Sequence, residues 1–464
     1  MKNYLVFTMA TLLLGTACSS KKEHAEGFTG APGEVKLITL DPGHFHAALV
    51  QKVSYPQVSK DVYVYAPTGF DVNEHLKRIE GFNTRAENPT LWNEIVYTGT
   101  DYLEKMLAEK KGNVMIQAGN NGKKTEYIKK TLEAGINVLS DKPMAINSQN
   151  FKLLEECFDI ARQKNVLLYD IMTERNEITT MLQRELSTIP AIYGEQLKGS
   201  PDEPAIVKES VHHLFKLVDN KPLTRPVWYF DVTQQGEGIV DVTTHLVDLV
   251  QWEAFPEQII DYKKDIELVD ANRWTTSISP EEFKQVTGTD AYPDFLKKDV
   301  ENDTLKVYCN GDIVYKIKGV TAKVSVIWNY TFPEGGGDTH FSVMKGSKAD
   351  LIIRQGQEQG YKPELYIEAL PDIDLAAYEK ELAAAMSTVA DKYPGVALDK
   401  VSDNVWQVQI PASYRVGHEA HFGQVMENYL QYLKDGKLPD WEVPNMIAKY
   451  YVTTHALEMA KAKK

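Results

Sequence analysis

The sequence is poor in cysteine and has few long apolar runs. Only Cys18, Cys157 and Cys309 occur among 464 residues, which excludes a disulfide-rich scaffold and a cysteine-based metal site. Beyond the first twenty residues, no stretch is apolar enough to predict a membrane span. Basic residues are outnumbered as well, and the net charge of −14 argues against a nucleic-acid partner, because such binding relies on basic patches.

The N-terminus has the pattern of a targeting segment rather than of folded structure. Lys2 precedes a short apolar stretch at 4–14, and small residues stand directly before Cys18. This resembles a bacterial lipoprotein signal, with residues 1–17 removed and Cys18 lipidated. We therefore expect residues 18–33 to be a polar tether, and the protein to be lipid-anchored in the bacterial cell envelope, periplasmic or surface-exposed.

The remaining chain is long enough for two domains. Between 34 and 172, short apolar segments alternate with helical patterns, which predicts βαβ units and a doubly wound, Rossmann-like parallel sheet. The expected strands are 35–40, 61–66, 94–98, 113–118, 136–140 and 166–170, and the first expected helix is 44–54.

Residues 173–464 have a different texture, typical of an α+β domain with a large open, mainly antiparallel sheet. The expected strands are 192–198, 227–233, 303–308, 313–317, 321–330, 340–344 and 350–354. Residues 356–412 are expected to be an insertion that contains a helix at 372–394, and 418–462 to be two helices broken at 436–440. The overall fold class is α/β.

Residues 236–248 form the first motif, GEGIVDVTTHLVD. A helix through this run would place Asp241, His245 and Asp248 on one face. A carboxylate beside an imidazole often holds a general base in one tautomer. The alternative is that Asp241 complements a helix N-terminus while His245 packs in the core.

The second motif is AGINVLSDKPMA, within the strand, loop and helix pattern of 113–146. Its Lys142 would stand at the carboxyl end of a parallel strand, where α/β proteins bind ligands. The alternative is that this Lys-Pro is a surface turn.

The order and spacing of the two motifs resemble the Gfo/Idh/MocA oxidoreductase family over roughly residues 35–460. The resemblance implies that Lys142, Asp241 and His245 are the catalytic set. Asp141 stands where the family usually has Glu. The resemblance also implies NAD or NADP as cofactor and a carbohydrate or glycoside as substrate, and it leaves a homo-oligomer open.

The cofactor site departs from the usual dinucleotide pattern. The first turn has one glycine instead of three, and no acidic residue ends the second strand. His46 matches a histidine that the family often has. Since a helix N-terminus favours anions, this turn is still expected to hold phosphate. The expected cofactor-binding residues are Pro42, Gly43, His44, Phe45, His46, Ala118, Gly119, Asn120, Asn121, Asp141, Lys142 and Arg175.

Two other functions remain open. One is a metal-assisted glycan lyase or hydrolase that uses His212, His213, His418 or His421, although the sequence assigns no metal site. The other is a glycan-binding protein on a Rossmann shell that no longer binds nucleotide. Arg175 is also open to a second interpretation, an interdomain salt bridge.

Overall fold

The computed structural model describes residues 27–218, 221–332 and 336–463. Cys18, the expected signal segment and most of the expected tether lie outside the described residues. No helix within the described ranges is both long and apolar enough to cross a membrane.

The N-terminal domain is a six-stranded sheet in the order β3-β2-β1-β4-β5-β6, with every strand pair parallel. Strands β1, β4, β5 and β6 are buried along their whole length, as expected when helices cover both faces. The predicted doubly wound sheet is confirmed. Its strands are β1 Leu37–Leu40, β2 Asp61–Ala66, β3 Asn93–Thr98, β4 Val114–Gln117, β5 Asn137–Asp141 and β6 Leu168–Ile171.

The strand order reverses between β1 and β4, and ligands of such sheets bind at the carboxyl ends of the strands beside this reversal. The turn after β1 and the loop after β4 therefore border the expected cleft. The helices of this domain are α1 His46–Leu49, α2 Phe70–Thr84, α3 Tyr102–Glu109, α4 Asn121–Glu133 and α5 Ser148–Lys164.

The C-terminal domain is built on a ten-stranded, mostly antiparallel sheet in the order β10-β12-β13-β7-β14-β15-β16-β18-β17, with β11 paired to β12. Among the described ladders of this second sheet, only the β7–β13 pair is parallel. The predicted open sheet is confirmed. Its strands are β7 Ile206–His213, β10 Ile266–Ile278, β11 Val300–Glu301, β12 Thr304–Ile317, β13 Val320–Asn329, β14 Thr339–Lys345, β15 Ala349–Gln355, β16 Glu364–Ala369, β17 Ala397–Ser402 and β18 Val405–Gln409.

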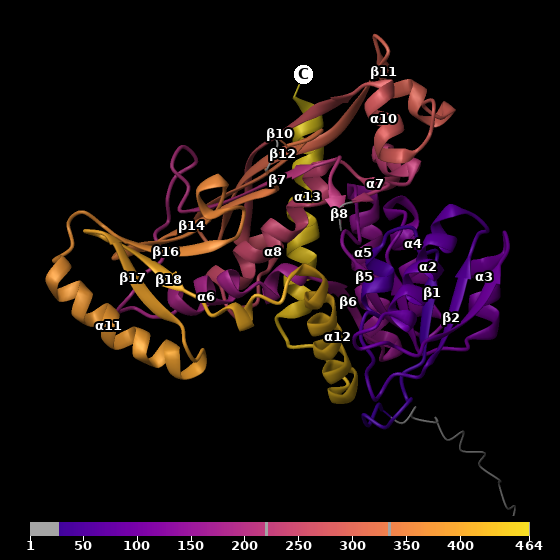
Figure 1. Cartoon of the computed structure of the whole chain (residues 1–464), viewed down its shortest axis with the longest axis horizontal. Helices are drawn as coiled ribbons and strands as arrows, with labels where there is room; N and C mark the ends of the chain where they lie inside the picture. Colours follow the sequence, from indigo (N-terminus) through magenta and orange to yellow (C-terminus); the bar gives the residue numbers. More distant parts are fainter. Residues whose placement is uncertain (1–26, 219–220, 333–335, 464) are drawn as a thin grey trace, which may run out of the picture.

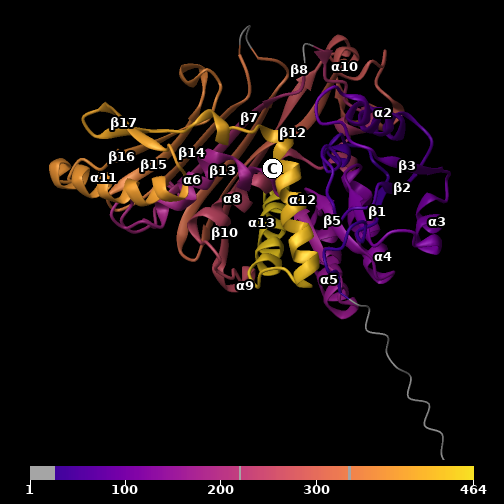
Figure 2. The same ribbon diagram turned by 60° about the horizontal axis from the view of Figure 1, so that its bottom comes forward.

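Helices pack on this sheet and join it to the first domain. The expected closing pair is present as α12 His418–Asp435 and α13 Glu442–Ala462, which lie between the two domains (Figures 1 and 2). Helix α13 packs on β10 and α5, and α12 contributes apolar side chains to the core of the N-terminal domain. The region that the sequence predicts to be an insertion contains β16, α11 Leu375–Lys392, β17 and β18, at the sheet edge far from the first domain (Figure 1).

Three expected elements are wrong. Residues 192–198 form turns with one isolated bridge, and the expected helix 44–54 is reduced to α1. The expected strand 227–233 is instead the 3-10 helix η2 Val227–Phe230 followed by α7 Val232–Gln235. The Asp231 carboxylate caps α7 by accepting from the Thr233 amide at 3.0 Å, which favours a helical start over an extended chain.

Candidate active site

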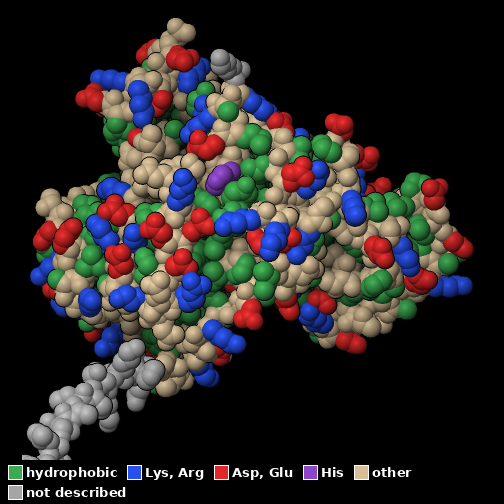
Figure 3. Space-filling view, turned by 180° about the vertical axis from the view of Figure 1, so that it is seen from behind, with side chains coloured by type: hydrophobic (Ala, Val, Ile, Leu, Met, Phe, Trp, Pro, Cys, Tyr) green, Lys and Arg blue, Asp and Glu red, His purple; other side chains and the backbone are tan. Residues whose placement is uncertain are grey.

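A cavity of about 190 Å³ lies between the domains at the carboxyl ends of the N-terminal strands. We call it the inner cavity. In the view from behind, a histidine is visible in a hollow beneath the lobe that carries α10 Pro280–Thr287 (Figure 3). The N-terminal domain contributes His44, Phe45, His46, Gly119, Asn121, Asp141 and Lys142 to the inner cavity, and the C-terminal domain contributes Glu174, His212, Lys216, Leu223, Arg225, Tyr229, Gln235, Asp241, Val242, His245, Trp328 and His418.

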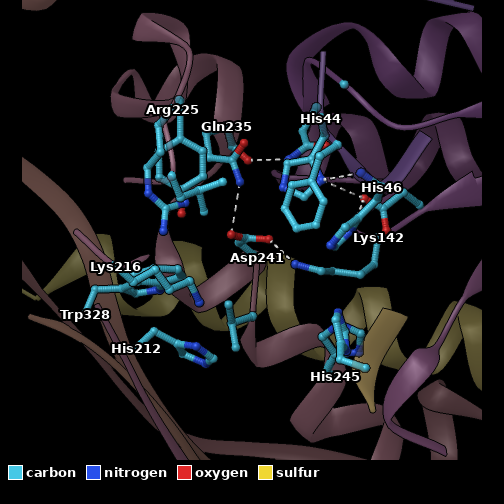
Figure 4. A pocket seen from close by; sticks show the side chains of 18 of the residues that line it. His44, His46, Lys142, His212, Lys216, Arg225, Gln235, Asp241, His245 and Trp328 are labelled. Carbon is cyan, nitrogen blue, oxygen red and sulfur yellow. Dashed lines mark hydrogen bonds and ion pairs between the residues drawn. The ribbon is translucent and has the colours of Figure 1, made fainter. Parts of the chain in front are cut away.

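Lys142 and Asp241 form a buried ion pair across the domain boundary (Figure 4). Lys142 Nζ donates to Asp241 Oδ1 at 2.6 Å, and Gln235 Nε2 donates to Asp241 Oδ2 at 3.0 Å. Burial lowers the pKa of Lys142, but the Asp241 and Asp141 carboxylates outweigh burial and raise that pKa. Burial raises the pKa of Asp241, and Lys142 reverses this shift. Both groups therefore stay charged at neutral pH.

His245 is a neutral imidazole in the wall of the inner cavity. It lies in the first turn of α8 Thr243–Ala254. Burial and the nearby Lys142 ammonium lower the pKa of His245 to about 4. Its Nδ1 has no hydrogen-bond partner among the described residues. A neutral imidazole facing a cavity is suited to accept a proton.

The expected single helical face for Asp241, His245 and Asp248 is wrong. Asp241 follows the short 3-10 helix η3 Gly238–Val240 and precedes α8, and its carboxylate is held by Lys142 and Gln235 rather than by His245. Asp248 accepts from Arg175 at 2.7 Å and from Lys449 at 2.9 Å, away from the inner cavity. The Asp241 carboxylate therefore holds Lys142 in position and does not orient the His245 imidazole.

His44, His46 and Asp141 form a second cluster, on the N-terminal side of the inner cavity. His46 Nδ1 lies 3.0 Å from Asp141 Oδ2, and His44 Nδ1 lies 3.8 Å from the same oxygen. Burial holds the pKa of both imidazoles well below the ordinary value. Their ligand atoms and that of Asp141 lie within 4.8 Å of one another, and His46 and Asp141 are hydrogen-bonded to each other.

The histidines of the metal hypothesis separate into different places. His212 and His213 lie within ion-pair distance of Asp338, at 3.6 and 2.9 Å. His418 pairs with Glu174 at 3.3 Å. Burial lowers the pKa of His418, but the Glu174 carboxylate outweighs burial and raises it. Among the described residues, none of His212, His213, His418 and His421 belongs to a group of three or more potential metal ligands.

The turn after β1 has an unusual construction. Asp41 has a left-handed backbone with φ of 46°, a conformation that glycine usually supplies and that Asp tolerates. The amides of Gly43 and His44 both donate to the Ala118 carbonyl at 3.1 Å. A Cβ at Gly43 would lie 3.0 Å from Trp228 Cζ2, and a Cβ at Gly119 would lie 2.4 Å from the Asp41 carbonyl oxygen. Glycine at these two positions therefore lets the turn pack closely on the β4 loop.

Two further cavities continue the inner cavity along the turn. The turn cavity, about 480 Å³, is lined by residues 42–45, by α2 side chains between 70 and 78, and by residues 223–226. The β2 cavity, about 420 Å³, lies between residues 66–72 at the end of β2 and residues 225–228. The series extends from Lys142 to the end of β2, which is the path a dinucleotide takes across a Rossmann sheet. The inner cavity and the β2 cavity, at the two ends of the series, fit NAD or NADP. At the turn after β1, the Gly43 and His44 amides that would face the pyrophosphate already donate to the Ala118 carbonyl.

Other residues expected at the cofactor site lie in different places. Asn121 lines the inner cavity and donates to the Gln235 carbonyl at 2.7 Å. Asn120 caps α4 and donates to Gln234. Ala118 is buried beneath the turn, and Arg175 lies outside the three cavities, paired with Asp248 and with Glu442.

Sequence reasoning missed three cleft residues, namely Gln235, Asp71 and Arg225. Gln235 holds Asp241, and Asp71 lines both outer cavities while accepting from Trp228 Nε1 at 2.9 Å. Burial raises the pKa of Asp71 to about 6, although the Trp228 hydrogen bond lowers it. Arg225 lines all three cavities. Gln235 directly precedes the 236–248 motif, so the motif could have pointed to it. No local pattern in the sequence marks Arg225.

Two family models match the chain. Residues 72–170 match "Oxidoreductase family, NAD-binding Rossmann fold", the Gfo/Idh/MocA model. Residues 182–461 match "Putative oxidoreductase C terminal domain". The first match begins after the shortened turn. No curated protein matches the chain.

Solved structures share this fold over 92–95% of the chain. A crystal structure of a "putative oxidoreductase" from Parabacteroides merdae is 89% identical, covers 95% of this chain and 100% of its own, and has a TM-score of 0.94. A levoglucosan dehydrogenase in complex with NADH is 12% identical, with 92% and 97% covered and a TM-score of 0.59. A 3-ketoreductase mutant from Actinomadura kijaniata in complex with TDP-benzene and NADP is 13% identical, with 92% and 97% covered and a TM-score of 0.55.

Proposed function

The chain belongs to the Gfo/Idh/MocA family of oxidoreductases, with an NAD-binding Rossmann domain, and from that premise we propose that it acts on a carbohydrate or glycoside. The observation that carries the proposal is the buried Lys142–Asp241 ion pair at 2.6 Å, in one cavity with the neutral imidazole of His245. A charged donor beside a neutral base suits the interconversion of a hydroxyl and a carbonyl.

The roles of the residues follow from their charge states. His245 accepts the hydroxyl proton of the substrate, because its lowered pKa keeps it neutral and unprotonated. The Lys142 ammonium donates a hydrogen bond to the same oxygen and stabilises negative charge that develops there. Asp241, supported by Gln235, holds Lys142 in position. NAD or NADP, when bound, supplies the hydride acceptor or donor.

The choice of a sugar substrate rests on the shape of the site and on structural neighbours. The inner cavity combines several imidazoles with carboxylates and a lysine, which suits a ligand rich in hydroxyl groups. A neighbour with this fold is a levoglucosan dehydrogenase in complex with NADH and levoglucosan. Asp71, in the β2 cavity, would accept from ribose hydroxyls and repel a ribose phosphate, which favours NAD over NADP.

A substrate screen tests the proposal. The protein is incubated with NAD or NADP and with levoglucosan, hexoses or their methyl glycosides, and formation of the reduced nicotinamide is followed by absorbance. Lys142→Ala and His245→Ala should each lower kcat/KM at least about a hundredfold. His455→Ala is the matched control, because His455 lies on α13 and bonds to the Tyr451 carbonyl. Near-normal rates in both active-site variants would contradict the catalytic roles of Lys142 and His245.

We further propose that the protein works outside the cytoplasm, anchored through Cys18, and retains its cofactor between turnovers. No free dinucleotide pool is expected there, so a retained cofactor would be recycled within one cycle or between two sugars. Denaturing the purified protein and analysing the supernatant by mass spectrometry should recover NAD or NADP. Cys18→Ala should move the protein from the membrane fraction to the soluble fraction. If Cys18→Ala stays in the membrane fraction, the proposed lipid anchor at Cys18 is wrong.

One observation favours a second function, a glycan-binding protein without redox activity. The engaged amides of Gly43 and His44 leave the turn with fewer donors for a pyrophosphate. This alternative predicts sugar binding that is indifferent to dinucleotide and to Lys142→Ala. Titration of the protein with a bound sugar, in the presence and absence of NAD, separates the two functions.

A further inference from the structure

Arg225 is a buried cation that has no countercharge among the described residues. Its exposed fraction is 7%, and no carboxylate pairs with it among the described residues. Its Nε donates to the Leu214 carbonyl at 2.8 Å and its Nη2 to the His213 carbonyl at 3.2 Å. Proteins rarely bury a charge unless it is paired, because desolvation of a lone ion is costly. The position therefore indicates an anionic ligand.

The guanidinium is also held in place by aromatic rings. It lies 4.7 Å from the centroid of Tyr229 and 5.3 Å from that of Trp328. In Figure 4 Arg225 lies across the inner cavity from His44 and Lys142. A stacked, hydrogen-bonded guanidinium is pre-organised, so little conformational entropy is lost when it binds a ligand.

The location of Arg225 identifies the ligand group. Among the described residues, it alone lines the inner cavity, the turn cavity and the β2 cavity. In the turn cavity it belongs to the wall that faces residues 42–45. A dinucleotide with its nicotinamide beside Lys142 and its adenosine at the end of β2 must place its pyrophosphate between them, and therefore beside Arg225.

The turn after β1 explains why an arginine is needed. The pyrophosphate usually receives backbone N–H groups from a glycine-rich turn, but here Gly43 and His44 donate to the Ala118 carbonyl. We propose that Arg225, carried by the C-terminal domain, binds the dinucleotide pyrophosphate in place of these amides. The inference rests on the proposed function. Guanidinium groups bind phosphate oxygens in pairs, so the contact would also clasp the two domains around the cofactor.

Binding measurements on fragments of the cofactor test this inference without catalysis. ADP-ribose contains the pyrophosphate, and adenosine does not. Arg225→Gln should weaken ADP-ribose binding by about tenfold to a hundredfold, measured by calorimetry, and leave adenosine binding within about twofold of the wild type. Arg225→Lys should recover part of the loss. Arg354→Gln is the matched control, because Arg354 also lies against an aromatic ring, that of Tyr366, but is outside the three cavities and pairs with Glu368; its ADP-ribose affinity should stay within about twofold of the wild type.

The outcomes separate this inference from the proposed function. Equal ADP-ribose affinity of wild type and Arg225→Gln overturns the inference while the oxidoreductase function stands. A wild type that binds neither ADP-ribose nor NAD overturns both. If Arg225→Gln instead loses affinity for glucuronate and keeps ADP-ribose, the arginine binds a substrate carboxylate, and the inference fails.

A second measurement does not depend on folding of the variant. A crystal structure of the wild type with ADP-ribose should place pyrophosphate oxygens within hydrogen-bond distance of the Arg225 guanidinium. Pyrophosphate bound by the backbone amides of 43–45, with Arg225 still on the Leu214 and His213 carbonyls alone, would contradict the inference.

Discussion

The Asp241→Asn substitution removes one charge from the buried pair and keeps the shape of the side chain. At the observed 2.6 Å, the Coulomb attraction is roughly 6 kcal/mol with an effective dielectric constant of about 20, and desolvation of both groups opposes it. Removal of one partner from such a pair usually costs about 3–5 kcal/mol. Asp141 still acts on the lysine, so we expect the lower end, about 3 kcal/mol of unfolding free energy.

The pH dependence of this loss has a definite sign. The pKa of Lys142 is raised in the folded protein, so its contribution to stability is present below the unfolded pKa and lost as pH rises through the folded pKa. The pKa of Asp241 is lowered, so its contribution is present above the unfolded pKa and lost as pH falls through the folded pKa. The difference between wild type and Asp241→Asn should therefore be greatest near neutrality and shrink at both extremes.

Urea denaturation at several pH values measures the stability, and kcat against pH measures the catalytic consequence. Without Asp241 the pKa of Lys142 falls, so the alkaline limb of kcat should move to lower pH. Asp270→Asn is the control, because Asp270 pairs with Lys463 and both side chains are half-exposed. Such a surface pair contributes about 0–1 kcal/mol to stability. An Asp241→Asn protein with wild-type stability and an unchanged pH profile would refute the reasoning.

Three further predictions follow from the same structure. Arg175→Gln should cost about 3 kcal/mol of stability, because it leaves Asp248 and Glu442 buried without their shared cation, yet should not change dinucleotide affinity in a calorimetric titration; a specific loss of affinity would restore Arg175 to the cofactor site. Asp71→Asn should raise the affinity for NADP relative to NAD by at least about threefold, and an unchanged ratio would remove Asp71 from the ribose. The folded pKa of His245 is lowered to about 4, so its contribution to stability is present above the unfolded pKa and lost as pH falls through about 4. The same protonation should lower kcat/KM at acidic pH, and His245→Gln should abolish that fall. A fall that persists in the variant would belong to another group.

The parts of the site that were predictable are those that lie next to a strand end. Lys142 follows β5 directly, so the alternation of strands and helices was enough to place it at the mouth of the sheet. The role of Asp241 was not predictable in this way. A Cβ at Gly238 would lie 1.8 Å from the Cys309 carbonyl oxygen, so β12 presses on the motif and interrupts the helix that its periodicity suggests.

Residues whose environment is made by distant segments could not be assigned from sequence. The partners of Arg175 lie 73 and 267 positions away. The motif pattern pairs Asp248 with His245 rather than with Arg175, and no local pattern marks Glu442. Arg225 stands in an ordinary Thr-Arg-Pro segment, and it becomes a buried cation only when the Leu214 carbonyl and the Tyr229 and Trp328 rings are brought around it. The β-branched and aromatic residues at 227–233 predict a strand, but the capping contact of Asp231 and the packing of Phe230 on Phe283 favour short helices.

Transfer of a label from sugar to cofactor tests the central claim most directly. The purified protein is mixed in a single turnover with NAD and perdeuterated glucose, galactose, levoglucosan or their methyl glycosides, and the dinucleotide is then recovered and weighed by mass spectrometry. The account predicts that deuterium appears on the nicotinamide with at least one of these sugars, and that Lys142→Ala and His245→Ala abolish the transfer. Dinucleotide that stays unlabelled with every sugar, in a protein shown to bind both ligands, would contradict it.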